Sequence, residues 1–479
     1  MGLQFVQGRP IRGPKGFDSS HCILLPLKGL PIRAGELFPA ENKSCSAASK
    51  EGNHEPDSTI AMKRTPAQLP TLALLCALAT ASASAATADW PQWRGPDRTD
   101  VSKESGLLKT WPASGPKRVW LFENAGLGYS GPAIVAGKLF TMGARDGVEY
   151  LLAVDIKDGK QLWEAKIANA FRNDRGDGPR GTPAADGGRV YGLGGQGTLI
   201  CANAADGKVL WQRTMSEFGG HRPGWGYSES VLVDGNKVLC TPGGAQGAIV
   251  ALDTKTGEPV WQSKDLTDGA QYASIIPANF NGTRQYIQLT MKHIAGVSAA
   301  DGKVLWTSDW PGQTAVIPTP IFQDGQVYVS SGYGVGSKLV KIGSSGNDVS
   351  DVYFSKVMKN HHGGVVLVDG YLFGYSDGVG WVCQDFKTGE QVWAEKKALG
   401  KGAIAAADGM LYCLAEDSST AVLIAASPAG WQEHGRFTLD PQSTQRSQDH
   451  RIWTHPVIVG GRLYLRDQEL LFCYDVKAP

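Results

Sequence analysis

Short apolar stretches separated by turn residues recur along the chain from about residue 115 to its end. The segment Ala153–Trp163 has the sequence AVDIKDGKQLW, and the segment Ala251–Trp261 has ALDTKTGEPVW. In each, an apolar strand ends at an Asp, a Gly follows four residues later, and a Trp follows four residues after the Gly. Because Gly supplies the positive φ that a tight turn needs, the pattern predicts a β-hairpin that presents a large ring at a fixed position.

Two series of positions indicate how many such units the chain contains. The repeat Trp occurs at Trp120, Trp163, Trp211, Trp261, Trp306 and Trp393. Its two gaps, near Phe354 and over 431–437, are interpreted as degenerate copies. A second series, in which a Gly-containing turn precedes an apolar and usually an aromatic residue, marks Phe140, Tyr191, Leu239, Tyr286, Tyr328, Phe373, Tyr412 and Tyr464. Their spacing of roughly 40–50 residues is typical of four-stranded propeller blades.

The two ends of this region hold complementary halves of one repeat. Cys473-Tyr474-Asp475 begins a copy that the chain does not complete, and the segment 115–120 supplies the missing Gly and Trp. We therefore predict an all-β fold: an eight-bladed β-propeller of four-stranded antiparallel blades over residues 116–479. Pairing of the N- and C-terminal strands should close the ring.

The residues before the repeats divide into three parts. Residues 1–61 show no repeat and are interpreted as a mis-annotated or unstructured leader. Residues 62–88 resemble a signal peptide, with Lys63-Arg64, an apolar stretch and a run of small residues, and cleavage is expected after Ala85 or Ala88. A long n-region is the alternative for 1–61, and lipidation at Cys76 is the alternative to soluble export. Residues 89–115 form an N-terminal extension. The protein is expected to be exported, periplasmic or secreted, and not transmembrane after cleavage.

Charge and cysteine content narrow the function classes. The chain carries 47 Lys and Arg against 46 Asp and Glu, a balance that does not indicate a nucleic-acid or anionic membrane partner. Five of its eight cysteines follow the expected signal peptide, at strand positions where other copies have small or apolar residues. They are Cys201, Cys240, Cys383, Cys413 and Cys473. We interpret them as buried free thiols, with disulfides as the alternative.

From Trp120 to Val476 the repeat resembles that of pyrroloquinoline-quinone (PQQ) propellers, on the two segments quoted above. The resemblance implies a fold shared by quinoprotein dehydrogenases and by non-catalytic BamB-type exported propellers. The segment Trp90–Pro96 also resembles the leader of an exported PQQ-like subgroup. Family enzymes hold PQQ with Ca²⁺, a carboxylate base, a stacking Trp and a vicinal disulfide. This chain has no adjacent cysteines and no long inserted loops.

The expected function is therefore a non-catalytic binding or scaffold protein of the cell envelope, with no catalytic residues and no cofactor. The partner would be a protein or another envelope component, and the protein is expected to be a monomer. The alternative is a PQQ-dependent oxidoreductase with PQQ and Ca²⁺ in the central channel.

Residues just before each innermost strand should line one rim of the channel. The candidate ligand-binding residues there are Arg180, Thr182, Tyr227, Glu229, His361, His362, Lys401, Trp453 and His455. Such a rim suits a small anionic or polar ligand, and the alternative is that it contacts ordered water alone. Assuming that His361 and His362 lie on a strand, their side chains should point to opposite faces, so no metal site is predicted. The segment Gly332–Gly336 is expected to be a tight connection between strands.

Overall fold

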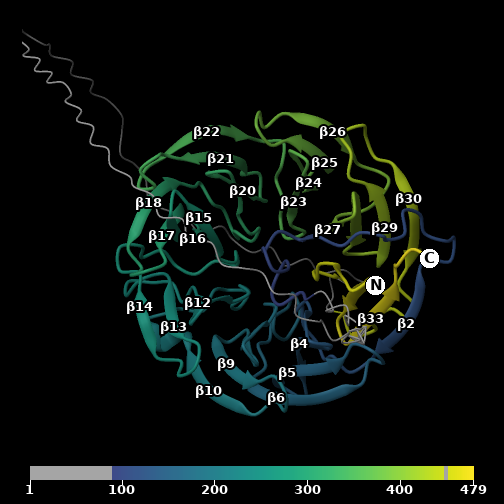
Figure 1. Ribbon diagram of the computed structural model, residues 1–479, viewed down its shortest axis with the longest axis horizontal. Coiled ribbons are helices and arrows are strands. Elements are labelled where there is room, and N and C mark those ends of the chain that lie inside the picture. The colour runs from purple at the N-terminus through teal and green to yellow at the C-terminus, as the bar shows by residue number, and fades with distance from the viewer. Residues whose placement is uncertain (1–88, 447–450) are drawn as a thin grey trace, which may run out of the picture. The chain divides into compact units, whose positions relative to one another are not determined.

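The computed structural model describes residues 89–446 and 451–479, which form a ring of β-sheets around a central axis (Figure 1). The expected leader at 1–61, the signal peptide at 62–88 and Cys76 lie outside the described residues. Thirty-three described strands form eight sheets, seven of four strands and one of five. The helical structure among the described residues is one short 3-10 helix, Met215–Phe218, and no helix there could cross a membrane.

Each sheet is one blade, and its four main strands follow one another from the axis to the perimeter (Figure 1). Blades 1 and 2 contain β3 (Ala133–Val135), β4 (Lys138–Arg145), β5 (Val148–Asp155), β6 (Gln161–Asn169), and β7 (Ala184–Asp186), β8 (Arg189–Leu193), β9 (Thr198–Asn203), β10 (Val209–Thr214). Blades 3 and 4 contain β11 (Leu232–Asp234), β12 (Lys237–Cys240), β13 (Val250–Asp253), β14 (Pro259–Gln262), and β15 (Ile276–Phe280), β16 (Thr283–Leu289), β17 (His293–Ser298), β18 (Val304–Asp309).

Blades 5 and 6 contain β19 (Ile321–Gln323), β20 (Gln326–Ser331), β21 (Gly336–Ile342), β22 (Val349–Ser355), and β23 (Val365–Val368), β24 (Tyr371–Ser376), β25 (Gly380–Asp385), β26 (Gln391–Glu395). Blade 7 contains β27 (Gly402–Ala407), β28 (Met410–Ala415), β29 (Thr420–Ala425) and β30 (Glu433–Thr438), with β1 (Val101–Ser102) added beside β27. Blade 8 contains β31 (Val457–Val459), β32 (Arg462–Asp467), β33 (Leu470–Asp475) and β2 (Lys117–Phe122). The prediction of eight four-stranded antiparallel blades is confirmed.

Blade 8 closes the ring with strands from both ends of the propeller. Strand β2 pairs antiparallel with β33, so that Lys117 lies opposite Asp475 and Trp120 lies opposite Cys473. The split repeat thus forms one continuous sheet, and the predicted closure is confirmed. This pairing satisfies the outer edge of β33, which would otherwise be open to pairing with another chain.

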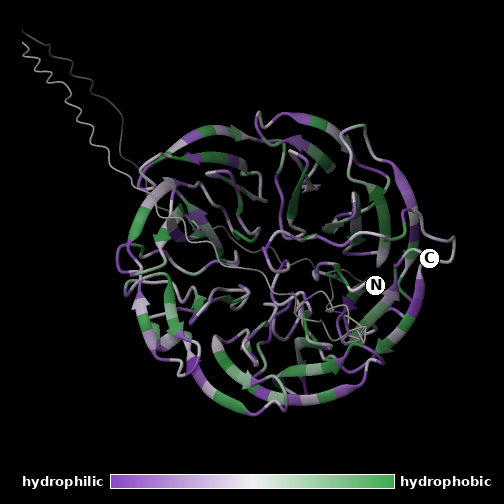
Figure 2. Ribbon diagram, viewed as in Figure 1, coloured by the Kyte–Doolittle hydropathy of each residue, from purple (hydrophilic) through white to green (hydrophobic). Residues whose placement is uncertain are grey.

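The repeat Trp side chains join neighbouring blades. In blade 2, Gly207 lies against the ring of Trp163 of blade 1 so closely that a Cβ there would be 2.6 Å from it. The indole Nε1 of Trp163 donates to the carbonyl of Ala204, 3.2 Å away. Strand β6 shows the underlying alternation, because Trp163 and Ala165 are buried while their neighbours are exposed. Figure 2 shows this mixture of hydrophobic and hydrophilic positions along the perimeter strands.

The two gaps in the Trp series are filled by other aromatic residues. Tyr353 in β22 occupies the Trp position, and its hydroxyl donates to the carbonyl of Phe386 at 3.0 Å. Phe437 in β30 packs against Gly115, where a Cβ would lie 2.6 Å from it. Trp306 departs from the pattern, because its Nε1 donates to the side chain of Gln285 in its own blade. The two degenerate copies therefore keep the packing without the Trp.

The N-terminal extension crosses the axis and contacts most blades. Its backbone pairs with blade 1 through Trp90 and Ile134, and its β1 pairs in parallel with β27 of blade 7. Three of its side chains donate hydrogen bonds to other blades. Trp93 donates to Thr319 of blade 5, and Arg94 donates to the carbonyl of Val365 in blade 6. Arg98 donates to the carbonyls of Ser230 and Val231 in blade 3. The extension is therefore an integral part of the fold.

The five described cysteines, Cys201, Cys240, Cys383, Cys413 and Cys473, are buried free thiols in the blades, as predicted. Burial raises the pKa of each thiol above its ordinary value. Because the thiolate is the reactive form, these cysteines serve as small apolar residues in the sheets.

Candidate functional site

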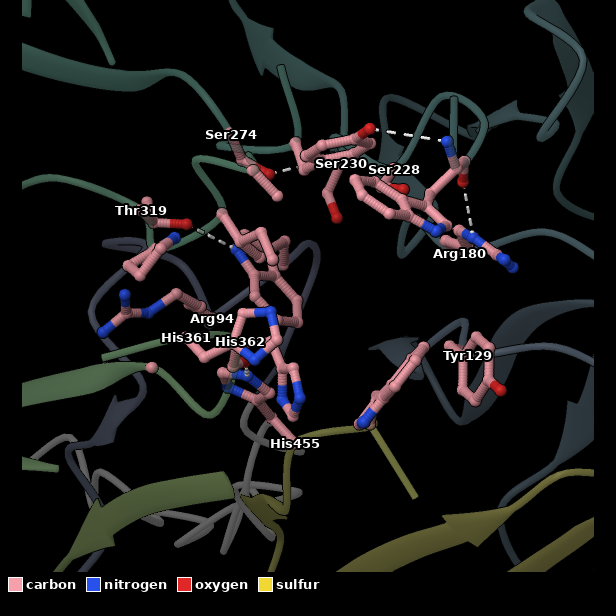
Figure 3. A pocket seen from close by; sticks show the side chains of 18 of the residues that line it. Arg94, Tyr129, Arg180, Ser228, Ser230, Ser274, Thr319, His361, His362 and His455 are labelled. Atoms are coloured by element: carbon pink, nitrogen blue, oxygen red, sulfur yellow. Dashed lines mark hydrogen bonds between the residues drawn. The ribbon is translucent and has the colours of Figure 1, made fainter. Parts of the chain in front are cut away.

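A cavity of about 510 Å³ lies where the inner strands converge (Figure 3). It is lined by the segments that precede β3, β7, β11, β15, β19, β23 and β31, seven of the eight segments expected at the rim, and the segment before β27 does not line it. Five of the nine candidate residues line it: Arg180, His361, His362, Trp453 and His455. A volume of this size is typical of sites that bind small molecules.

The other four candidates, Thr182, Tyr227, Glu229 and Lys401, lie behind the cavity wall. Side chains alternate along the extended chain that leads into β11, so Ser228 and Ser230 line the cavity while Tyr227 and Glu229 point into the blades. Thr182 is buried, and Lys401 supports His361 from behind. The placement expected for these four residues at the cavity surface was therefore wrong, because their side chains do not face the cavity.

Glu229 is a buried carboxylate, 2 % exposed, and its Oε1 accepts a hydrogen bond from the backbone of Thr241. Burial raises its pKa to about 7, an effect that this hydrogen bond and the charge of Arg98 only partly oppose.

His361 and His362 lie in the loop before β23, and the expectation that they sit on a strand was wrong. Strand alternation does not apply there, and the two rings pack in a tilted arrangement with their centroids 4.4 Å apart. Among the described residues there is no group of three or more His, Cys, Asp or Glu side chains arranged to hold a metal ion.

Burial favours the neutral form of both histidines. Burial lowers the pKa of His361 to about 3, with further lowering by His362 and by Lys401. Lys401 lies 2.8 Å from His361 Nδ1 and 2.7 Å from Asp377. An ammonium group can only donate, so Nδ1 accepts and the ring proton of His361 is on Nε2. Burial also lowers the pKa of His362, whose Nε2 lies 3.1 Å from Glu416.

Arg180 is held rigidly at one wall. Its guanidinium donates to the carbonyls of Trp225, Gly178 and Gly176 at 2.7, 3.2 and 2.8 Å, and it lies over the ring of Tyr129. Burial lowers the pKa of its guanidinium below the ordinary value of an arginine. Its hydrogen bonds go to backbone carbonyls, so no directly bonded carboxylate among the described residues neutralises its charge.

The floor of the cavity comes from the N-terminal extension, which the sequence did not assign to the site. Trp93 packs against His455 with ring centroids 4.5 Å apart, and its indole donates to Thr319 Oγ1 at 2.9 Å (Figure 3). Arg94 pairs with Asp100 at 2.9 Å, and Asp100 lies 2.8 Å from His455 Nδ1. The only sequence signal for this floor was the Trp90–Pro96 motif.

Tyr333 is a further residue of the cavity wall, and it lies in the segment that the sequence predicted to be a tight connection between two strands. The segment Gly332–Gly336 links β20 to β21, as predicted, and its Tyr333 lines the cavity. The ring of Tyr333 meets that of His361 edge-on, with centroids 4.7 Å apart. No periodicity marks such a turn residue as part of a site.

The cavity does not fit the group that quinoprotein dehydrogenases use. The enzymes that the repeat resembles use a carboxylate to take the substrate proton and oxygen ligands to hold Ca²⁺. Among the described residues that line the cavity, none is Asp or Glu. The nearby carboxylates of Asp377 and Glu416 lie against Lys401 and His362 instead.

Comparisons with known proteins agree with the fold. A family model described as outer membrane protein assembly factor BamB matches residues 116–219 and 149–362, together more than half of the chain. The chain is 24 % identical to tetrathionate hydrolase of Acidithiobacillus ferrooxidans over 46 % of this chain and 44 % of that protein. It is 28 % identical to BamB of Kangiella koreensis over 24 % of this chain and 28 % of that protein. The matches thus span less than half of either relative.

Two solved structures share the fold at low identity. BamB from Moraxella catarrhalis matches with a TM-score of 0.50 and 16 % identity, over 73 % of this chain and 95 % of that one. Quinohemoprotein alcohol dehydrogenase from Comamonas testosteroni matches with a TM-score of 0.54 and 11 % identity, over 82 % of this chain and 81 % of that one. The repeat, the eight closed blades and the family match lead to one conclusion: the chain belongs to the BamB family of PQQ-like β-propellers.

Proposed function

We propose that the protein is a non-catalytic binding propeller of the cell envelope. The observation that carries this proposal is the composition of the axial cavity. Its described lining combines aromatic rings, hydroxyls, histidines and arginine without a carboxylate. Such a lining suits binding, whereas it offers no carboxylate to accept the proton of an alcohol as hydride leaves.

The family and the closed ring both support a protein or another envelope component as the binding partner. BamB relatives are described as outer membrane protein assembly factors, and this supports a protein or another envelope component as partner. The signal peptide predicted at residues 62–88 supports export. A closed ring with its N-terminal extension bound across the axis is a rigid body that can present loops to a partner, and we propose that it acts as a monomer.

The dehydrogenase alternative gives a direct test. We expect that the exported protein, incubated with PQQ and Ca²⁺ and then supplied with primary alcohols and a redox dye, will reduce no more dye than a blank without protein. The reason is that the described lining of the cavity lacks a carboxylate, both as the base and as a ligand for Ca²⁺. The measurement is the initial rate of dye bleaching, with a known quinoprotein dehydrogenase as the positive control.

Alcohol-dependent dye reduction that requires both PQQ and Ca²⁺ would contradict the proposal. Uptake of PQQ that is independent of Ca²⁺ and gives no turnover would not, because it would be binding without catalysis.

A further inference from the structure

Three hydroxyl groups of the cavity wall already accept a hydrogen bond from the protein. Ser230 Oγ accepts from the backbone N–H of Thr182 at 2.8 Å, and Ser274 Oγ accepts from that of Ser230 at 2.9 Å. Thr319 Oγ1 accepts from the indole of Trp93 at 2.9 Å. Each hydroxyl still has its own hydrogen to donate. Three O–H donors are therefore available at the wall formed by blades 3, 4 and 5 (Figure 3).

The remaining polar lining adds donors and positive charge. Arg180 brings a guanidinium whose positive charge lies at the wall, and His361 carries its proton on Nε2 because Nδ1 accepts from Lys401. Arg94 also lines the cavity, but its charge is neutralised by Asp100. Since the described lining includes no carboxylate, donors outnumber strong acceptors, and an anion is the complementary ligand.

The apolar part of the lining consists mainly of flat rings. Tyr129 and Trp453 pack with centroids 4.7 Å apart on one side, and Trp225 and Tyr272 pack with centroids 5.9 Å apart on another. Trp93 of the extension closes the floor. Aromatic walls favour a ligand with a flat, apolar body that can stack on them. The volume of about 510 Å³ lies within the range of pockets that bind small organic molecules.

We propose that the cavity between the extension and the inner strands binds a small organic anion with a flat aromatic body, and binds it without a metal ion. The carboxylate of the ligand is held by the hydroxyls of Ser230, Ser274 and Thr319 and by the charge of Arg180. Its ring system stacks on the aromatic walls. This inference rests on the proposed function, because it names a ligand for the binding site.

The probe is 2-naphthoate, and its neutral counterpart is 2-naphthalenemethanol, which keeps the ring system and lacks the charge. Titration calorimetry of the exported protein in the presence of EDTA should give a Kd at least tenfold lower for 2-naphthoate. A Kd that is equal for the two probes, or no binding of either, would overturn the inference.

A matched pair of variants locates the binding in this cavity. Ser228 lines the wall, is partly exposed, and makes a single long hydrogen bond of 3.4 Å to Gly226, so a longer side chain can be accommodated there. Ser228→Glu adds a negative charge, whereas Ser228→Gln adds the same bulk without charge. We expect Ser228→Glu to weaken 2-naphthoate binding at least tenfold relative to Ser228→Gln, and to leave 2-naphthalenemethanol binding within about threefold.

Equal affinity of the two variants for 2-naphthoate would show that the anion binds elsewhere and would overturn the inference. Dye reduction with PQQ, Ca²⁺ and alcohol is measured on the same preparation. Dye reduction in that assay would contradict the proposed function, whatever the naphthoate result. Loss of the preference for 2-naphthoate without dye reduction would contradict this inference alone.

Discussion

Replacing Asp100 with Asn should lower the free energy of unfolding by about 3–5 kcal/mol, because it leaves Arg94 as an uncompensated buried charge. Both side chains of this ion pair are 1 % exposed, and Asp100 also lies against His455 of blade 8. Asn is chosen because Asp100 has a φ of 58°, a conformation that Asn tolerates and most residues do not. The measurement is urea unfolding followed by tryptophan fluorescence.

Asp97→Asn is the matched control in the same segment. Asp97 pairs with Lys103 at the surface, and both side chains are largely exposed. Exposed pairs contribute between zero and about 1 kcal/mol, so this variant should unfold at nearly the same urea concentration as the parent. If Asp100→Asn proved as harmless as Asp97→Asn, the extension would not be anchored through the Arg94–Asp100 pair.

Replacing Glu229 with Gln changes the free energy of unfolding by an amount that depends on pH. This change should be about 3 kcal/mol more stabilising at pH 8 than at pH 4.5. The pKa of Glu229 is raised from its ordinary 4.5 to about 7, mainly by burial. Between these two values the unfolded chain loses its proton while the folded protein keeps it, so the parent loses stability as the pH rises. From about one pH unit above the folded pKa, the loss is nearly complete and constant. Gln has no such proton and removes this loss.

Glu123→Gln provides the comparison, because Glu123 is an exposed carboxylate at the end of β2. The unfolding free energy of the Glu123→Gln variant should follow that of the parent protein across the whole pH range. The observable is the difference between variant and parent in urea unfolding at pH 4.5, 6 and 8. A difference for Glu229→Gln that stays flat with pH would mean that Glu229 is hydrated or paired rather than buried.

The architecture was predictable from the sequence because propeller blades repeat locally. Each hairpin carries its own turn Gly and its own Trp, and the unfinished copy at Cys473 required a partner near Trp120. The gap near Phe354 was harder, since the residue that takes the Trp position is its neighbour Tyr353. One hydroxyl in place of an indole N–H keeps the same bond to the next blade, and no spacing rule identifies that exchange.

The site was predictable only in part, because it depends on side-chain register and on distant segments. Counting residues before each inner strand located Arg180, His361 and Trp453 correctly. It could not decide that Ser228 faces the cavity while Glu229 faces the blade, because the chain leading into β11 is extended and one residue changes the face. The floor was missed, since Trp93 reaches the site by crossing the ring from outside the repeats.

The central claim is that residues 90–102 close one end of the axial channel and so create the binding cavity. Hydrogen exchange of the peptide covering this segment, followed by mass spectrometry, tests it most directly. The amides of Trp90, Thr99 and Asp100 donate to carbonyls at 2.7, 2.9 and 2.9 Å, and β1 pairs with β27. Exchange as slow as that of the inner strand β27 is predicted. Exchange as fast as that of an exposed loop would contradict the claim, because the channel would then lack its floor.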